Sequence, residues 1–224
     1  MKIVQAANDN LAELMSFYRV MCDVLGEKSF LPNGDKGGFP SQAMVEESIK
    51  DRCQFIGIED NKIVAAYILN HDCDSAYNTV HWQINAAKNE VVIMHALRVL
   101  PDYGGRGYSK QLVEHAIRTA RSRGWKAIRL DCLKGNDIPV KMYQSYGFKY
   151  VDTVDITYVD IGIPMPFHLY EFVVTIKGLP LPFPPCVDSC IAKDVKCVFD
   201  MLLVCFCTNH RNSFFPDHVR GTTN

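Results

Sequence analysis

The sequence lacks the features that mark several classes of protein. It has no run of about 18 or more uncharged apolar residues, so we expect no membrane-spanning helix. Its formal net charge of −1 leaves it without the positive field of a nucleic-acid-binding protein. Its N-terminal sequence, MKIVQAANDN, lacks the apolar core and cleavage site of a secretory signal peptide. We therefore expect a cytoplasmic protein that binds neither nucleic acid nor a membrane.

The cysteines form no regular pattern. The chain has nine of them, an odd number, mostly scattered, and no Cys-x-x-Cys pair occurs. Disulfide frameworks and structural zinc sites need regularly spaced cysteines. We therefore expect reduced thiols and no metal site.

The length and composition fit one main globular domain. The chain has 224 residues, of which 48% are hydrophobic and 22% are charged. After Lys177 the composition changes: residues 178–185 hold four of the eleven prolines, and five of the nine cysteines follow them. We expect a main domain over residues 1–177 and a Pro/Cys-rich C-terminal extension of unknown role over residues 178–224.

The role of this extension stays open at the level of sequence. It contains an apolar run, Val195–Cys207, that is too short to span a bilayer. The run fits a helix that docks on the domain or on a second copy of the chain, which would make a homodimer. It equally fits an extension with little structure.

Hydrophobic periodicity predicts strands and helices in the order β-α-α-β-β-β-α-β-α-β-β. The polar segment 71–88 contains one further candidate for a short strand, Thr79–Ile84. The predicted strands cover residues 2–7, 54–59, 62–70, 90–100, 126–133, 148–157 and 167–176, and the predicted helices cover residues 10–25, 41–50, 107–124 and 138–146.

This order predicts the fold class. A strand, a helix and a second strand around residues 99–112 imply a parallel pair with a right-handed crossover, and the hairpins imply antiparallel neighbours. We therefore expect an α/β fold with a central mixed sheet and helices on both faces.

The most informative stretch is Val99–Leu112, VLPDYGGRGYSKQL. A predicted strand ends there, a glycine turn follows, and a periodic helix begins. Glycines let a ligand approach the backbone, and the start of a helix presents unpaired N–H groups and a positive dipole end. Arg106 adds a positive charge within the turn. The stretch therefore predicts an anion-binding site.

Two motifs together resemble the GNAT N-acetyltransferase superfamily. In that family a strand ending in V-x-P-x-Y/F precedes Arg/Gln-x-x-Gly-x-Gly/Ala at the start of a helix. Gly104, Gly107 and Ser109 take the three defining positions. Only Gly107 matches, because Gly104 lacks the usual long polar side chain and Ser109 carries a hydroxyl where the family has glycine or alanine.

The second motif lies downstream, in Ile128–Phe148, where a strand is followed by Asn136, Tyr143 and the pair Gly147-Phe148 at the family's spacing. The resemblance covers roughly residues 1–176. It implies a GNAT-like acyl-CoA N-acyltransferase fold and acetyl-CoA as acyl donor. The cofactor-binding residues that it implies are Leu97, Val99, Gly104, Gly105, Arg106, Gly107, Tyr108, Ser109, Asn136 and Tyr143.

Tyr143 is the candidate general acid, because a phenol with an ordinary pKa of about 10 can protonate the departing thiolate of CoA. The alternative is a half-buried tyrosine of the core. Asn136 fits either a contact to the cofactor or to a catalytic water, or an ordinary helix N-cap.

The general base has several candidates. His95 and Glu90 are the first two, since an amine must lose a proton before it attacks and histidine titrates in the required range. Glu59 and Asp131 are alternatives. Cys132 suggests a covalent acyl-enzyme, but a lone cysteine in an apolar strand usually serves packing.

The expected activity is transfer of an acetyl group from acetyl-CoA to a primary amine of a small molecule or peptide by direct attack. The acceptor pocket is expected beneath the loop Phe30–Pro40 and the segment His71–Trp82. The alternative is a catalytically weak GNAT-like module that binds acyl-CoA as a sensor or scaffold.

Overall fold

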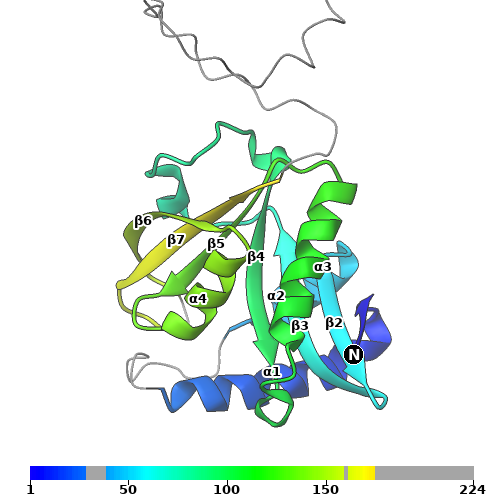
Figure 1. Cartoon of the computed structure of the whole chain (residues 1–224). Helices are drawn as coiled ribbons and strands as arrows, with labels where there is room; N and C mark the ends of the chain where they lie inside the picture. Colours follow the sequence, from blue (N-terminus) through cyan, green and yellow to red (C-terminus); the bar gives the residue numbers. More distant parts are fainter. Residues whose placement is uncertain (29–38, 159–160, 175–224) are drawn as a thin grey trace, which may run out of the picture. The chain divides into compact units, whose positions relative to one another are not determined.

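The computed structural model describes residues 1–28, 39–158 and 161–174 (Figure 1). The predicted extension 178–224, its apolar run and most of the loop Phe30–Pro40 lie outside these residues. The proposed domain boundary near residue 177 therefore stays a prediction.

A seven-stranded sheet forms the centre of the fold, in the order β1-β2-β3-β4-β5-β7-β6. All neighbours are antiparallel except β4 and β5, which are parallel. The strands are β1 (Lys2–Gln5), β2 (Gln54–Glu59), β3 (Lys62–Asn70), β4 (Val91–Val99), β5 (Ala127–Leu133), β6 (Lys149–Ile156) and β7 (Met165–Val173).

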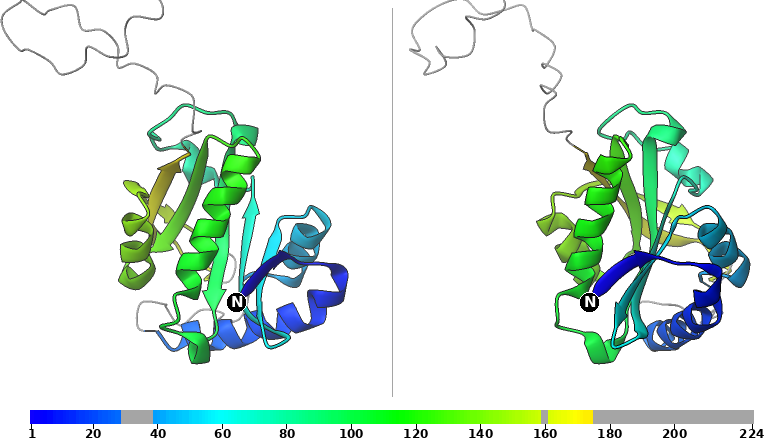
Figure 2. Two further views of the ribbon diagram at one scale, coloured as in Figure 1. Left: turned by 45° about the vertical axis from the view of Figure 1, so that its right-hand side comes forward. Right: turned by 90° about the vertical axis from the view of Figure 1, so that its right-hand side faces the viewer.

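Helices cover both faces of this sheet, as predicted. In the right-hand view of Figure 2, α3 lies on one side of the sheet and α1 and α2 lie on the other. The helices are α1 (Leu11–Gly26), α2 (Gln42–Lys50), α3 (Tyr108–Ser122) and α4 (Asp137–Ser145). The predicted order of strands and helices is confirmed. None of the helices formed by the described residues is long and apolar enough to cross a membrane.

The short strand predicted over Thr79–Ile84 is wrong. The connection between β3 and β4 instead forms 3-10 turns at Ser75–Asn78 and Lys88–Glu90. Both β4 and β5 already have strand neighbours on each side. The N–H of Gln83 donates to the side chain of Glu171 at 2.7 Å rather than to a neighbouring strand.

A β-bulge in β4 changes which side chains face each layer. Ile68 of β3 pairs with His95 and Ala66 pairs with Arg98, so β4 carries one extra residue at this point. Ala96 adopts a left-handed φ of +50°, which is typical of a strained functional position rather than of a regular strand. The bulge therefore shifts the alternation of the strand by one residue.

The two layers show this shift directly. Before the bulge, Met94 packs with α3, and after it Leu97 and Val99 pack on that same side. Ala96 and Leu100 pack with α1 on the opposite side. A single extra residue thus places the second half of β4 in a new register, next to the glycine turn.

Candidate functional site

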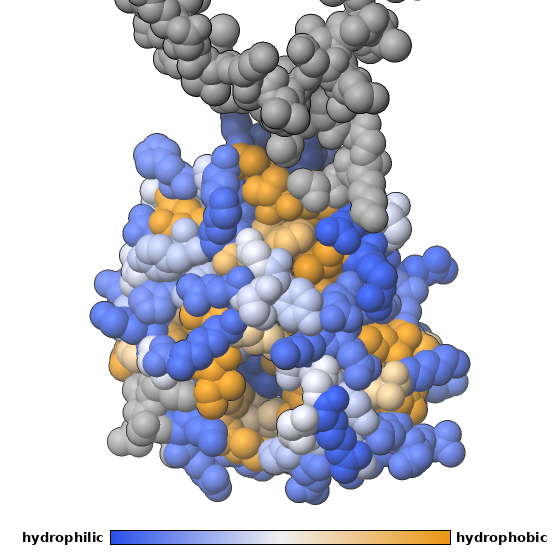
Figure 3. All heavy atoms as spheres, in the orientation of Figure 1, coloured by the Kyte–Doolittle hydropathy of each residue, from blue (hydrophilic) through white to orange (hydrophobic). Residues whose placement is uncertain are grey.

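A cleft opens where the two parallel strands separate. Only Val91–Ile93 of β4 pairs with β5, opposite Ala127–Arg129. Beyond these pairs, residues of both strands line a cleft with a volume of about 560 Å³. Figure 3 shows hydrophobic atoms (orange) around a hollow in the lower half of this face. The separation leaves backbone groups of β4 available to a bound molecule.

The glycine turn forms one end of this cleft. Gly105 and Gly107 both adopt a φ of +75°, and an added Cβ at either position would meet nothing within 4 Å. The N–H groups from Gly105 to Lys110 donate to no residue that the structure describes. These free N–H groups, together with the N-terminus of α3, form a cradle that fits a pyrophosphate.

Most of the predicted cofactor-binding residues meet in this cleft. Arg106 is the exception, because its guanidinium lies 3.3 Å from the Glu59 carboxylate and 4.8 Å from the centre of the Tyr103 ring. The residues that line the cleft as predicted are Leu97, Val99, Gly104, Gly105, Gly107, Tyr108, Ser109, Asn136 and Tyr143.

Glu59 also holds the other side of the turn. Its second carboxylate oxygen accepts a hydrogen bond from the Tyr108 hydroxyl. Glu59 lies outside the cleft lining and uses both oxygens to fix the turn. It is therefore placed as a support of the cradle rather than as a base.

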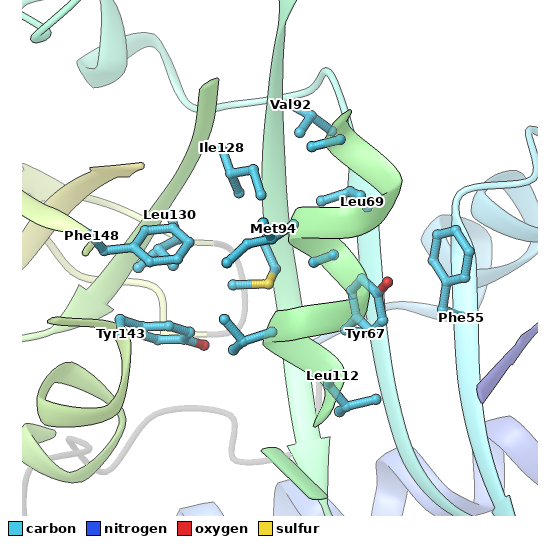
Figure 4. Packing of buried hydrophobic residues seen from close by; sticks show 14 of the residues in the cluster. Phe55, Tyr67, Leu69, Val92, Met94, Leu112, Ile128, Leu130, Tyr143 and Phe148 are labelled. Atoms are coloured by element: carbon cyan, nitrogen blue, oxygen red, sulfur yellow. The ribbon is translucent and has the colours of Figure 1, made fainter. Parts of the chain in front are cut away.

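Tyr143 lies on α4 with its ring in the core and its hydroxyl toward the gap between α4 and α3 (Figure 4). No hydrogen bond joins this hydroxyl to a described residue. Burial raises the pKa of Tyr143 well above its ordinary value, so the phenol stays protonated near neutral pH. This state is the one that a proton donor needs.

Asn136 and Cys132 line the same cleft as Tyr143. Asn136 is the N-cap of α4, but its side chain makes no capping hydrogen bond, so its amide is available to the cleft. Burial raises the pKa of the Cys132 thiol well above its ordinary value, which disfavours the thiolate that covalent catalysis requires.

His95 lies on β4 and lines the cleft. Its Nε2 lies 3.0 Å from Oδ1 of Asn70 and 2.9 Å from the carbonyl oxygen of Asp72. Both partners accept hydrogen bonds, so Nε2 carries the proton and Nδ1 keeps its lone pair. Burial lowers the pKa of His95, which favours the neutral ring.

Lowering the pH should therefore destabilise the protein through His95. Because the folded-state pKa lies below 6.5, the unfolded chain takes up the proton first. Stability is then complete above about pH 6.5 and falls as the pH drops toward the folded-state pKa. We expect His95→Gln to make this fall shallower in urea unfolding between about pH 5 and 7.5. Equal slopes in both proteins would contradict the assignment.

Glu90 does not reach the cleft. It lies at the start of β4, where Oε1 pairs with Nζ of Lys126 at 2.6 Å and Oε2 accepts from the N–H of Ala87 at 2.9 Å. The cleft lining begins only at Met94, further along the strand. This placement argues against Glu90 as a base, and its contacts are those of a loop support.

Asp131, unlike Glu90, reaches the cleft. It lies on β5 in the cleft lining. Its Oδ2 accepts hydrogen bonds from the hydroxyls of Tyr77 at 2.6 Å and Tyr158 at 2.8 Å. Its Oδ1 accepts none from a described residue. Burial and the nearby carboxylate raise the pKa of Tyr77, so this phenol remains a donor.

Two residues of this region escaped the sequence reasoning. Tyr158 lies in the connection between β6 and β7, where no local pattern distinguishes it. Arg98 follows Leu97 directly and lines the cleft, with NH1 donating to the Leu97 carbonyl at 3.0 Å. Only the bulge at Ala96 places this arginine there, and no motif signals it.

The mixed sheet, the splayed parallel pair and the glycine cradle together define an acyltransferase of the acyl-CoA-dependent class. Residues 25–148, more than half of the chain, match the model of the Acetyltransferase (GNAT) family. The chain belongs to this family, whose members use acetyl-CoA.

The chain is also similar in sequence to a known protein. An uncharacterized N-acetyltransferase of Methanocaldococcus jannaschii is 32% identical over 74 residues, which are 33% of this chain and 33% of that protein. The match thus spans a third of the relative's length.

Solved structures support the fold. An acetyltransferase of Salmonella typhimurium, solved with its cofactor acetyl-CoA, has a TM-score of 0.58 at 14% identity, covering 80% of this chain and 97% of that one. The ribosomal-protein-S18-alanine N-acetyltransferase of Escherichia coli has a TM-score of 0.55 at 17% identity, covering 81% and 99%.

Proposed function

We propose that this protein is an N-acetyltransferase that transfers the acetyl group of acetyl-CoA to a primary amine by direct attack. The supporting observation is that a protonated phenol, a neutral imidazole and a carboxylate line one cleft, at Tyr143, His95 and Asp131. The glycine cradle lies in the same cleft. When bound, acetyl-CoA supplies an acetyl thioester.

Each residue has a distinct task in this proposal. The N–H groups from Gly105 to Lys110 hold the pyrophosphate. Asp131 binds the acceptor ammonium through Oδ1, and Nδ1 of His95 accepts its proton. Tyr143 donates a proton to the departing thiolate. A backbone N–H of the bulged stretch after Ala96 stabilises the developing negative charge.

The walls of the acceptor side indicate the kind of amine. Apolar side chains from α1, from the segment before α2, from the β6–β7 connection and from β7 line the same cleft as Asp131: Met21, Val24, Leu25, Phe39, Ile161 and Phe167. We propose an acceptor that combines a primary amine with an apolar or aromatic substituent. An assay for released CoA thiol, run with aromatic, aliphatic and strongly polar amines, tests both proposals. Turnover with none of them would contradict the enzymatic function.

The departures from the family motif at Gly104 and Ser109 support the alternative, a catalytically weak GNAT-like module that binds acyl-CoA as a sensor or scaffold. The two functions differ in one measurement. A sensor would bind acetyl-CoA without consuming it in the presence of any amine of the panel.

The cradle itself gives a prediction with a matched control. Gly107→Ala and Gly124→Ala both place alanine at a left-handed φ, +75° and +72°, with nothing within 4 Å. Each should cost about 1–2 kcal/mol of stability. Only Gly107→Ala should also weaken acetyl-CoA binding, by about tenfold or more in calorimetry. Equal acetyl-CoA affinity of the two variants would contradict the placement of the pyrophosphate.

A further inference from the structure

A second cavity lies on the far side of Tyr77 from the cleft. Its volume is about 490 Å³, and it is bounded by the connection His71–Glu90, by the start of β4 and by Arg129. This connection joins two antiparallel neighbours, for which about 2–5 residues normally suffice. Long connections of this kind usually carry a function. The extra length here lines a cavity that is open to solvent.

The lining of this cavity is basic and rich in neutral donors. No Asp or Glu is among its residues, whereas Lys88 and Arg129 both are. Arg129 is fixed, because Nε lies 2.8 Å from the buried Glu171 carboxylate and the guanidinium lies 4.0 Å from the centre of the Trp82 ring. Asn78 and Asn85 add amide donors.

Lys88 supplies the charge that remains for a ligand. Its nearest carboxylate, on Asp72, is 3.7 Å away, and both side chains are more than 70% exposed. Such an exposed pair contributes little and is easily replaced by a stronger anionic partner. Beside Lys88, the indole of Trp82 and the side chain of Ile84 give the cavity an apolar wall.

Residues around this cavity hydrogen-bond to Asp131 and His95, the two residues proposed to bind and deprotonate the acceptor. Tyr77 lines it, and the hydroxyl of Tyr77 donates to Asp131 at 2.6 Å. The connection also supplies the Asp72 carbonyl that holds His95 at 2.9 Å. A molecule that orders this connection would therefore act on both residues.

We propose that this cavity is a second binding site for a small aromatic carboxylate, with Lys88 as its charge partner and with Trp82 and Ile84 as its apolar wall. The site regulates the acceptor side of the cleft through Tyr77, and this regulatory part rests on the proposed function. The binding part does not.

Binding can be measured without any enzymatic assay. The chain has two tryptophans, so Trp125→Phe leaves Trp82 as the reporter in the cavity. Benzoate should change its fluorescence saturably, also with saturating acetyl-CoA present, and the neutral isostere benzamide should bind at least about tenfold more weakly. Calorimetry on the unsubstituted chain gives the same comparison if Trp125→Phe does not fold.

Two lysine variants identify the site. Lys88→Gln should weaken benzoate binding by about tenfold, because it removes a charge-assisted hydrogen bond. Lys50→Gln, at an exposed lysine in the last turn of α2, should leave it unchanged. No saturable response to benzoate, displacement of benzoate by acetyl-CoA, or equal binding by both variants would overturn the proposal.

The regulatory part has its own readout. Benzoate should change KM for the amine at least about twofold, and Tyr77→Phe should abolish this change while retaining benzoate binding. Lysine-dependent benzoate binding without any acetyl transfer would refute the proposed enzymatic function and retain the second site. Benzoate binding with an unchanged KM would overturn the regulation.

Discussion

Tyr143→Phe should lower kcat for acetyl transfer by about 10²–10⁴-fold and leave the KM for acetyl-CoA nearly unchanged. The phenol is protonated at neutral pH and holds the proton for the departing thiolate, whereas phenylalanine has no proton to give. The fold should persist, since the hydroxyl has no hydrogen bond to a described residue that the substitution could break. Steady-state assays of released CoA thiol at saturating acetyl-CoA measure the effect.

Tyr146→Phe provides the matched control on the same helix end. The hydroxyl of Tyr146 bonds Glu114 at 2.7 Å, outside the cleft lining. The same atom is removed, so any general effect of losing a phenol appears in both variants. A kcat for Tyr143→Phe within about threefold of that of Tyr146→Phe would exclude Tyr143 as the general acid.

Asp131→Asn is expected to have the second-largest effect, a fall of about 10–100-fold in kcat/KM for the amine. The ammonium loses a charge-assisted hydrogen bond, which is worth about 1.5–3 kcal/mol. Because the proposed binding of acetyl-CoA does not involve this carboxylate, the KM for acetyl-CoA should change little. Asparagine keeps an oxygen that accepts from Tyr77 or Tyr158, so the local structure should survive.

Asp155→Asn, at an exposed position of β6, serves as the control for removing a carboxylate. Thermal unfolding of both variants separates misfolding from loss of binding. If Asp131→Asn raised the KM for acetyl-CoA as strongly as that for the amine, the carboxylate would not be specific to the acceptor, and the assignment would fail.

Local sequence patterns predicted most of the fold. The order of strands and helices was predictable because each has an apolar periodicity of its own, and the Asp60–Asn61 turn between β2 and β3 has the positive φ values of a tight hairpin. The segment 79–84 was mispredicted because its backbone bonds a distant side chain instead of a strand: the N–H of Gln83 donates to Glu171. Only the tertiary structure brings that partner to the segment.

In the candidate site, too, some residues were predictable from local motifs and others were not. The cradle and the position of Tyr143 follow from motifs of consecutive or closely spaced residues, and the structure brings them together in one cleft. Glu90 and Arg106 lie outside the cleft lining, because each pairs with a residue of opposite charge, Lys126 or Glu59, that lies far away in the sequence.

The sequence by itself determined the family, the glycine cradle and the candidate acid, because each rests on short-range spacing. Only the tertiary structure decided which carboxylate lines the cleft. Asp131 reaches the cleft because β4 and β5 separate after three pairs, and it is held there by Tyr77 and Tyr158 from two distant connections. No spacing along the chain encodes that meeting, since it depends on how the sheet opens.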